Sequence, residues 1–193
     1  MKSTRQSDLT RLLARLGKRS PVAAIVVIVL ILIAVKFWSS NKSEEDRTLV
    51  PGPAIVKRVV DGDTIILIQE TKDGTSHKRV EERVRLIGVD TPETVHPSKP
   101  VQPWGPEASE FTKQFLAGGT VKIALGATYR DKYERVLAFV YADDRMLNVA
   151  LARAGLARVK IYPGESCPET DLIVRAGEEA KAEEIGIWSG RKP

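Results

Sequence analysis

The hydrophobic positions of the chain fall into three kinds of pattern. Residues 22–35 form an unbroken apolar run, VAAIVVIVLILIAV. From residue 54 onward, short β-branched runs alternate with charged residues and are bounded by Gly or Pro, which is typical of β-strands. Further along, apolar residues recur every three or four positions in three segments, which predicts helices. The chain therefore divides into an apolar N-terminal segment and a mixed folded region.

The folded region is predicted to be a small α+β domain. Strands are expected over residues 54–60, 64–70, 79–89, 120–125 and 135–142, and helices over residues 107–116, 147–154 and 171–184. A turn is expected at residues 72–75, and a polar loop at residues 126–134. Short strands followed by interleaved helices favour a β-barrel with helices packed on it.

The N-terminal run is interpreted as a membrane anchor. The apolar run alone is shorter than the roughly 20 residues that span a bilayer. Residues 21–38 are long enough, because Lys36 can reach the head groups and Trp38 can lie at the interface. We therefore expect four parts, namely a basic cytoplasmic N-terminus (1–20), a transmembrane anchor (21–38), a linker (39–53) and a folded domain (54–190).

The charges around this segment set its expected orientation. Residues 1–20 carry six Lys or Arg and a single Asp, which keeps the N-terminus in the cytoplasm. A cleaved signal peptide remains an alternative, although residues 36–40 offer no clear small-x-small cleavage site. A buried core helix is disfavoured, because the run shows no amphipathic period. The anchor and the signal peptide both deliver the folded domain outside the cytoplasm.

The composition restricts the chemistry. Residues 1–50 carry nine Lys or Arg and four Asp or Glu, whereas residues 51–193 carry 21 of each, so the net charge of +5 belongs to the N-terminal segment. The domain is neutral, and we expect salt to slow its association with nucleic acid only modestly. One cysteine, Cys167, and two distant histidines argue against a zinc site. A bound metal would take carboxylate and carbonyl ligands, as calcium and magnesium do.

Three charged clusters interrupt the strand pattern, at residues 61–64 (DGDT), 85–93 (RLIGVDTPE) and 131–135 (DKYER). Singly, they are explained by a hairpin turn, a helix start and a solvated loop. Together they supply what phosphodiester hydrolysis needs, namely arginines for the phosphate, a carboxylate for the water and oxygen ligands for a cation. The spacing permits this convergence without specifying it.

The motifs VVDGDTI, RLIGVDTPET, WGPEASEF, DKYERVLAFVYADDRMLN and ALARAGLARV resemble the staphylococcal nuclease family in the same order, over about residues 54–190. The resemblance implies a five-stranded OB-type β-barrel with three helices, here preceded by one N-terminal transmembrane helix. It also implies a calcium-dependent, largely sequence-nonspecific endonuclease that cuts DNA and RNA and leaves 3′-phosphates. The site residues that it implies are Asp63, Asp90 and the Thr91 carbonyl for calcium, Glu93 for the water, Arg85 and Arg135 for the scissile phosphate, and Lys132 and Tyr133 for a neighbouring phosphate.

Three departures from the family pattern bear on the site. Glu134 stands where the family often has Gly, so the loop backbone is expected to differ and a negative charge borders the site. Tyr162 is only a weak candidate for a base contact. The hairpin over residues 69–82 is longer than usual, and its basic residues Lys72, Lys78, Arg79 and Arg83 are interpreted as solvated charges more readily than as nucleic-acid contacts.

The alternative to an active nuclease is an inactive OB-type domain that binds nucleic acid or protein. The nuclease is favoured, because a binding domain has no need of the metal carboxylates, Glu93 and both arginines together. The expected partners are DNA, RNA and, through the anchor, the membrane, with no protein partner and a monomeric state. Ligand type alone does not separate calcium from magnesium or manganese. Calcium is scarce in cytoplasm, which also favours a periplasmic or extracellular catalytic domain.

Overall fold

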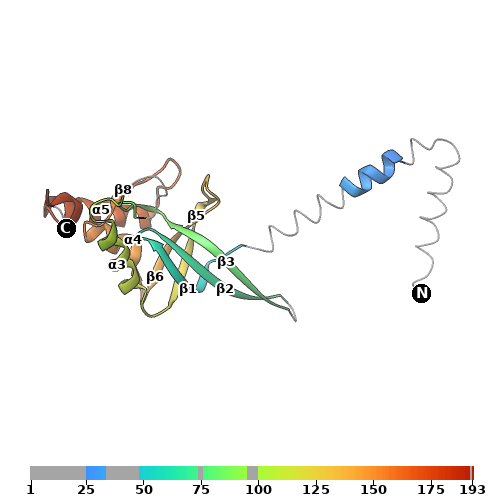
Figure 1. Cartoon of the computed structure of the whole chain (residues 1–193), viewed down its shortest axis with the longest axis horizontal. Helices are drawn as coiled ribbons and strands as arrows, with labels where there is room; N and C mark the ends of the chain where they lie inside the picture. The colour runs from blue at the N-terminus through green and yellow to red at the C-terminus, as the bar shows by residue number, and fades with distance from the viewer. Residues whose placement is uncertain (1–24, 34–47, 74–75, 95–99, 192) are drawn as a thin grey trace. The chain divides into compact units, whose positions relative to one another are not determined.

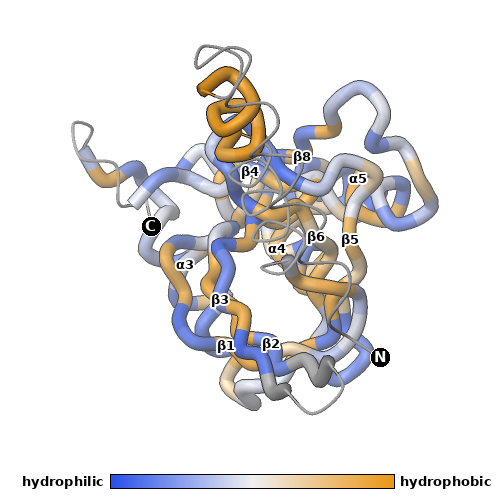
Figure 2. Tube along the Cα trace, turned by 90° about the vertical axis from the view of Figure 1, so that its right-hand side faces the viewer, coloured by the Kyte–Doolittle hydropathy of each residue, from blue (hydrophilic) through white to orange (hydrophobic). Residues whose placement is uncertain are grey.

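The computed structural model describes residues 25–33, 48–73, 76–94, 100–191 and 193. The chain splits into two compact units, Met1–Arg47 and Thr48–Pro193. In the first unit, residues 25–33 form a helix that is hydrophobic throughout (Figure 2). Within the described residues, no helix combines the length and apolar content needed to cross a bilayer. The expected N-terminus (1–20), half of the expected anchor (21–38) and much of the expected linker (39–53) lie outside those residues.

The second unit is built on a closed five-stranded barrel, as the family resemblance implies. Its strands are β1 (Gly52–Asp61), β2 (Thr64–Asp73), β3 (Ser76–Leu86), β5 (Thr120–Arg130) and β6 (Val136–Ala142). They follow the order β3-β2-β1-β5-β6, and a parallel pairing of β3 with β6 closes the barrel. The two-residue β7 (Arg145–Met146) pairs antiparallel with the end of β6, while β4 (Gly88–Asp90) and β8 (Arg158–Lys160) form a separate pair.

Alternation of side chains along the strands creates the core. In β6, Val136, Ala138 and Val140 are fully buried, because residues two apart point to the same side of a strand. Ile65 and Leu67 in β2 belong to the same apolar cluster, although Ile68 is also buried. β1 follows the pattern less strictly, since its pairing with β2 contains two register irregularities. The inner face of the barrel is therefore filled with aliphatic side chains, and the outer face is free for polar residues.

Three α-helices pack against the barrel, as predicted. They are α3 (Gly105–Phe115), α4 (Leu147–Arg153) and α5 (Pro168–Ala182), and a 3-10 turn, η1 (Gly186–Trp188), follows. Figure 1 shows the helices gathered at one end of the barrel, with the β2–β3 hairpin extending from the other. Thr112 in α3 donates a hydrogen bond of 2.7 Å to the Gly62 carbonyl, which fixes the turn between β1 and β2.

Some predicted boundaries differ from the structure. The polar loop expected at residues 126–134 is wrong in extent, because β5 continues to Arg130, which pairs with Val136. The loop is thereby reduced to residues 131–135. At the start of the domain, β1 begins at Gly52, and Leu49 is only 1% exposed. The chain thus enters the folded unit within the stretch expected to be a linker.

A buried asparagine joins β3, β4 and β6 near the site. Asn148, which is fully buried in α4, donates to the Ile87 carbonyl at 2.8 Å and accepts from the Val140 N–H at 3.1 Å. Ile87 is the residue between β3 and β4, where the chain bends. The amide therefore satisfies backbone groups that the bend leaves unpaired, and it fixes where β4 begins.

Candidate active site

A polar cleft of about 720 Å³ lies on the outer face of the barrel. It is bordered by the β1–β2 turn, the end of β3, β4, the 131–135 loop and β8. All eight residues expected to form the site line it, namely Asp63, Arg85, Asp90, Thr91, Glu93, Lys132, Tyr133 and Arg135. Segments that are far apart in the sequence, from Asp61 to Glu165, thus converge on one surface.

Arg85 is the most tightly held charged group of the cleft. Its guanidinium donates to the carbonyls of Leu86 and Val89, at 3.0 and 2.7 Å. Its remaining terminal nitrogen lies 3.1 Å from Asp63 Oδ2 and 2.9 Å from Asp90 Oδ1. The side chain is 13% exposed. Arg85 therefore presents a planar cation in a fixed orientation, between the two carboxylates that are expected to bind metal.

Asp63 is fixed from several sides, although it lies in a turn. Its carboxylate accepts from the Thr91 N–H at 2.8 Å and from the Thr64 hydroxyl at 3.2 Å. Its own N–H donates to Asp61 Oδ1 at 3.2 Å. The hydrogen bond to Thr91 links the β1–β2 turn to the segment after β4, two regions that are 28 residues apart. This contact sets the separation of Asp63 and Asp90.

Asp61 adds a third carboxylate to this end of the cleft. Burial, and then the negative charge of Asp63, raise the pKa of Asp61 from 3.8 to about 6, against the hydrogen bond from the Asp63 N–H. The charge of Glu93 contributes in the same direction. The raised pKa of Asp61 indicates a region of negative potential at this end of the cleft, which favours a bound cation. Sequence reasoning missed Asp61, because an Asp before Gly is explained by the turn itself.

Glu93 is held through its backbone. Its N–H donates to the side-chain carbonyl of Gln102, and the Gln102 N–H donates to the Glu93 carbonyl, both at 3.0 Å. This reciprocal pair joins Glu93 to Gln102, nine residues further along the chain. Glu93 thereby keeps a defined place at the edge of the cleft, within electrostatic reach of Asp61.

Arg135 is positioned by the loop to which it belongs. Its side chain donates to Asp131 Oδ2, with Nε at 2.8 Å and the terminal nitrogen at 2.7 Å. Asp131 Oδ1 accepts the backbone N–H groups of Tyr133 and Arg135, at 2.9 and 3.0 Å. Burial would raise the pKa of Asp131, but these hydrogen bonds outweigh it and lower the pKa. Sequence reasoning missed Asp131, although an Asp that bonds a backbone N–H two residues on is a recognisable turn signal.

Glu134 keeps a backbone conformation that Gly favours, contrary to the expectation that a Glu at this position would change the loop backbone. It adopts φ of 62°, in the left-handed region that favours Gly. Its carbonyl accepts from Arg130 at 2.7 Å, and Arg130 in turn forms an ion pair of 2.7 Å with Glu82 on β3. The Arg130–Glu82 pair therefore helps to hold a residue that the loop needs in a costly conformation.

Lys160 is a cation that sequence reasoning missed. Its ammonium lies 3.4 Å from Asp90 Oδ2 and 5.6 Å from the centre of the Tyr162 ring. The interaction with Tyr162, followed by the charge of Asp90, raises the pKa of Lys160. Both residues line the cleft. Only the pairing of β8 with β4 brings Lys160 to Asp90, and the sequence contains no sign of it.

The residues present fit a hard divalent cation. Asp63 and Asp90 converge, and Thr91 adds a carbonyl oxygen to which no described residue donates a hydrogen bond. Among the described residues, no three carboxylate, histidine or cysteine side chains are grouped so as to hold an ion by themselves. A cation here would rely on two carboxylates, the carbonyl and water, a ligand set that suits calcium or magnesium.

Comparison with known proteins agrees with this geometry. A family model described as "Staphylococcal nuclease homologue" matches residues 83–190. The thermonuclease of Staphylococcus intermedius is 45% identical over 168 residues, which cover 86% of this chain and 94% of the relative. The thermonuclease of Staphylococcus hyicus is 38% identical with the same coverage. Endonuclease YncB of Bacillus subtilis is 37% identical over 133 residues, which are 68% of this chain and 59% of that protein.

Proposed function

The chain belongs to the staphylococcal nuclease family, and we propose that it is a calcium-dependent endonuclease of low sequence specificity. In this proposal it hydrolyses phosphodiester bonds of DNA and RNA and leaves 3′-phosphates. The observation that carries the proposal is the convergence of Arg85, Arg135, Glu93 and two metal-type carboxylates on one cleft.

The scissile phosphate lies between the two arginines. Arg85 and Arg135 bind its non-bridging oxygens and stabilise the negative charge that builds up in the transition state. Glu93 accepts a proton from the attacking water. The water oxygen forms a bond to phosphorus, the bond to the 5′ oxygen breaks, and that oxygen takes a proton from solvent. The phosphate consequently stays on the 3′ side.

The remaining site residues bind and orient. Asp63, Asp90 and the Thr91 carbonyl would hold calcium, which would polarise the phosphate and the water. Lys132 and Tyr133 border the cleft beside Arg135, where they can contact an adjacent phosphate. Tyr133 is 67% exposed, so its ring and hydroxyl are accessible to substrate. These residues govern affinity more than the chemical step.

The test is digestion of linear double-stranded DNA, single-stranded DNA and RNA by the full-length chain in mild detergent. Calcium, magnesium and chelator are compared, and the 3′ ends of the products are probed with a phosphatase. We expect calcium-dependent cleavage of all three polymers that is lost in Arg85→Gln and Glu93→Gln. Arg175→Gln and Glu178→Gln on α5 remove the same charges away from the cleft and should leave activity unchanged. Binding without cleavage by the folded chain under every metal would favour the inactive binding domain.

We further propose that residues 21–38 anchor a monomer in the membrane, with the N-terminus in the cytoplasm and the catalytic domain outside. The apolar run and the basic residues before it support this. The described part, residues 25–33, is helical with almost entirely exposed apolar side chains. Carbonate-resistant membrane fractionation and external protease digestion test the anchor, and sedimentation tests the monomer. Release of the chain by carbonate, or its cleavage after this segment, would contradict the anchor.

A further inference from the structure

Beyond the cleft, the outer face of the barrel is formed by paired residues of β1, β2 and β3 that continue the rows of the cleft. Strand pairing places Asp61, Thr64 and Arg85 side by side across β1, β2 and β3. Residues that face one another in this way share one side of the sheet. The next row along the same face consists of Arg58, Ile66 and Arg83. Arg58 and Arg83 therefore lie next to the row of Asp61, Thr64 and Arg85, on either side of the half-buried Ile66.

These two arginines are available for a ligand. Arg58 and Arg83 are both exposed, and neither forms an ion pair with another described residue. Arg83 also lines the cleft itself. Glu81 lies two residues further along β3, away from the cleft. Both of its carboxylate oxygens accept from the Lys57 ammonium at 2.7 Å, so the positive charge of Lys57 is balanced. Arg79, two positions further along β3, lies directly opposite Glu70. Arg58 and Arg83 are thus unpaired cations next to the cleft, whereas Lys57, further along the described part of these strands, is paired.

The spacing of the row suits a nucleic acid strand. Arg83 lies two residues from Arg85 on β3, so the two Cα atoms are roughly 7 Å apart. Successive phosphates along an extended strand are separated by a comparable distance. Arg58 and Arg83, on either side of β2, are roughly 10 Å apart. A strand whose scissile phosphate lies at Arg85 would therefore bring its next phosphates between them, with Ile66 below the sugars.

We propose that Arg58 and Arg83 form a phosphate-binding row that extends the cleft along β1–β3 and holds the substrate strand beyond the scissile bond. This inference rests on the proposed nuclease function, because it takes the phosphate at Arg85 as its starting point. It adds a substrate requirement, namely that an oligonucleotide must be long enough to reach the row. A local cationic row also explains how a neutral domain binds a polyanion.

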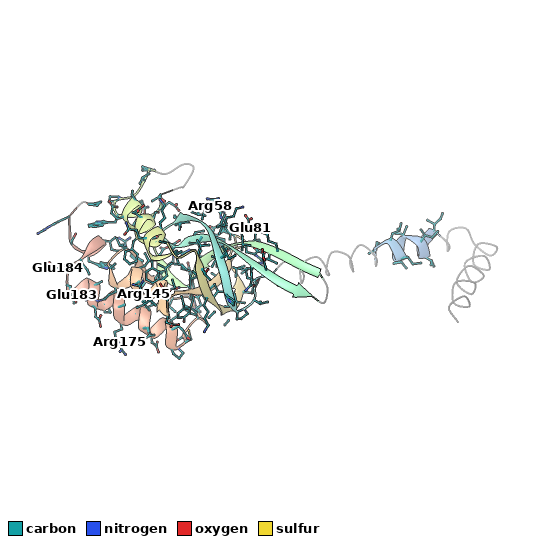
Figure 3. All side chains as sticks on the ribbon, turned by 90° about the horizontal axis from the view of Figure 1, so that it is seen from below. Arg58, Glu81, Arg145, Arg175, Glu183 and Glu184 are labelled. Carbon is teal, nitrogen blue, oxygen red and sulfur yellow. The ribbon has the colours of Figure 1, made fainter. Side chains whose placement is uncertain are left out.

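Binding provides the first test. The affinity of the full-length chain for a labelled single-stranded oligonucleotide is measured in chelator over a range of salt concentrations. Arg58→Gln/Arg83→Gln is compared with Arg145→Gln/Arg175→Gln, which loses the same charge on the helical side of the domain (Figure 3). Each lost phosphate contact lowers the salt slope by about 0.7, so the first variant should lose about 1.4 and the control nothing. Equal salt slopes of the affinity in the two variants would overturn the proposed phosphate-binding row.

Cleavage separates the row from the function on which it rests. With calcium, Arg58→Gln/Arg83→Gln should lower kcat/KM on a long single strand roughly tenfold through KM. It should leave unchanged the hydrolysis of a nitrophenyl ester of a single nucleotide, which cannot reach the row. If kcat/KM falls equally for both substrates, the arginines act on the site itself and the proposed phosphate-binding row is wrong. If the wild-type chain cuts neither substrate while the slopes still differ, the nuclease proposal fails and the row remains a nucleic-acid contact.

Discussion

Arg85 and Arg135, two of the three arginines that line the cleft, are held in different ways. Arg85 faces two backbone carbonyls and two carboxylates, which come from the end of β3, from β4 and from the β1–β2 turn. Arg135 depends mainly on Asp131, four residues before it in the same loop. The first is fixed by the closure of the barrel and the second by a local turn. Changes at the Arg85 end should therefore affect folding and activity together, whereas changes in the 131–135 loop should affect activity with less effect on folding.

The largest expected difference is between Arg85→Gln and Arg135→Gln. Arg85→Gln should lower kcat/KM by about 10³ or more and lower the free energy of unfolding by about 3 kcal/mol, because it leaves Asp63 buried without its cation. Arg135→Gln should lower kcat/KM by about 10² and the unfolding free energy by less than about 1 kcal/mol. Urea denaturation and steady-state kinetics measure both quantities. Equal losses of stability would remove the proposed distinction.

The stability of the domain should depend on pH through Asp61, which lies at the Arg85 end of the cleft. The raised pKa of Asp61 means that the folded state holds the proton more tightly than the unfolded state. Its contribution to stability is present below pH 3.8 and is lost as the pH rises through about 6, at a cost of about 2 kcal/mol. Asp61→Asn keeps an oxygen for the Asp63 N–H and should remove this loss. Urea denaturation of the wild type and of Asp61→Asn in chelator, at pH 4 and at pH 8, tests the effect. The same change in unfolding free energy between the two pH values in both proteins would rule it out.

At the loop end, Asp131→Asn should lower kcat roughly tenfold with little change in the melting temperature. The amide oxygen still accepts the two backbone N–H groups, but the ion pair that orients Arg135 is lost. The control is Asp171→Asn, which removes an exposed charge on α5. A double-mutant cycle with Arg135→Gln should show a strong interaction, since Asp131 acts only through Arg135. Additive effects would mean that Asp131 has another role.

Lys160 lies beside Asp90 at the Arg85 end of the cleft, and its removal should change metal binding. Lys160→Met should tighten calcium binding a few-fold, because a cation 3.4 Å from a metal ligand is lost. Lys160→Arg keeps the charge and serves as the control. Calorimetric titration of the full-length chain with calcium measures the change. Weaker binding in Lys160→Met would show that the lysine organises Asp90 for the metal.

The smallest effect is expected at Glu134. Glu134→Gly should raise the free energy of unfolding by about 0.5 kcal/mol, since relief of the left-handed conformation is partly offset by the greater freedom of Gly in the unfolded chain. KM should fall about twofold, because a negative charge leaves the border of the cleft. Glu134→Gln removes the charge and keeps the strained backbone, so it separates the two effects. An unchanged KM in both variants would mean that Glu134 affects only the backbone conformation and not substrate binding.

Much of the domain followed from local patterns. The five barrel strands and three helices are visible as runs with a period of 2 or 3.6, because each element must bury one face. The boundaries were less certain, since β5 continues through polar residues that only the Arg130–Val136 pairing stabilises. The expected site residues came from motifs, and the structure brings them to one cleft. The left-handed backbone of Glu134 was not expected, because Glu resists a conformation that Gly adopts freely.

The sequence by itself determined which residue types the cleft contains and in which elements they stand, because motif identity and periodicity are local properties. Only the tertiary structure decided which groups surround each of them. The four acceptors of Arg85, the approach of Lys160 to Asp90 and the alignment of Arg58 with Arg83 depend on strand pairing between distant segments. Pairing register is a property of the closed barrel, and no short stretch of sequence specifies it.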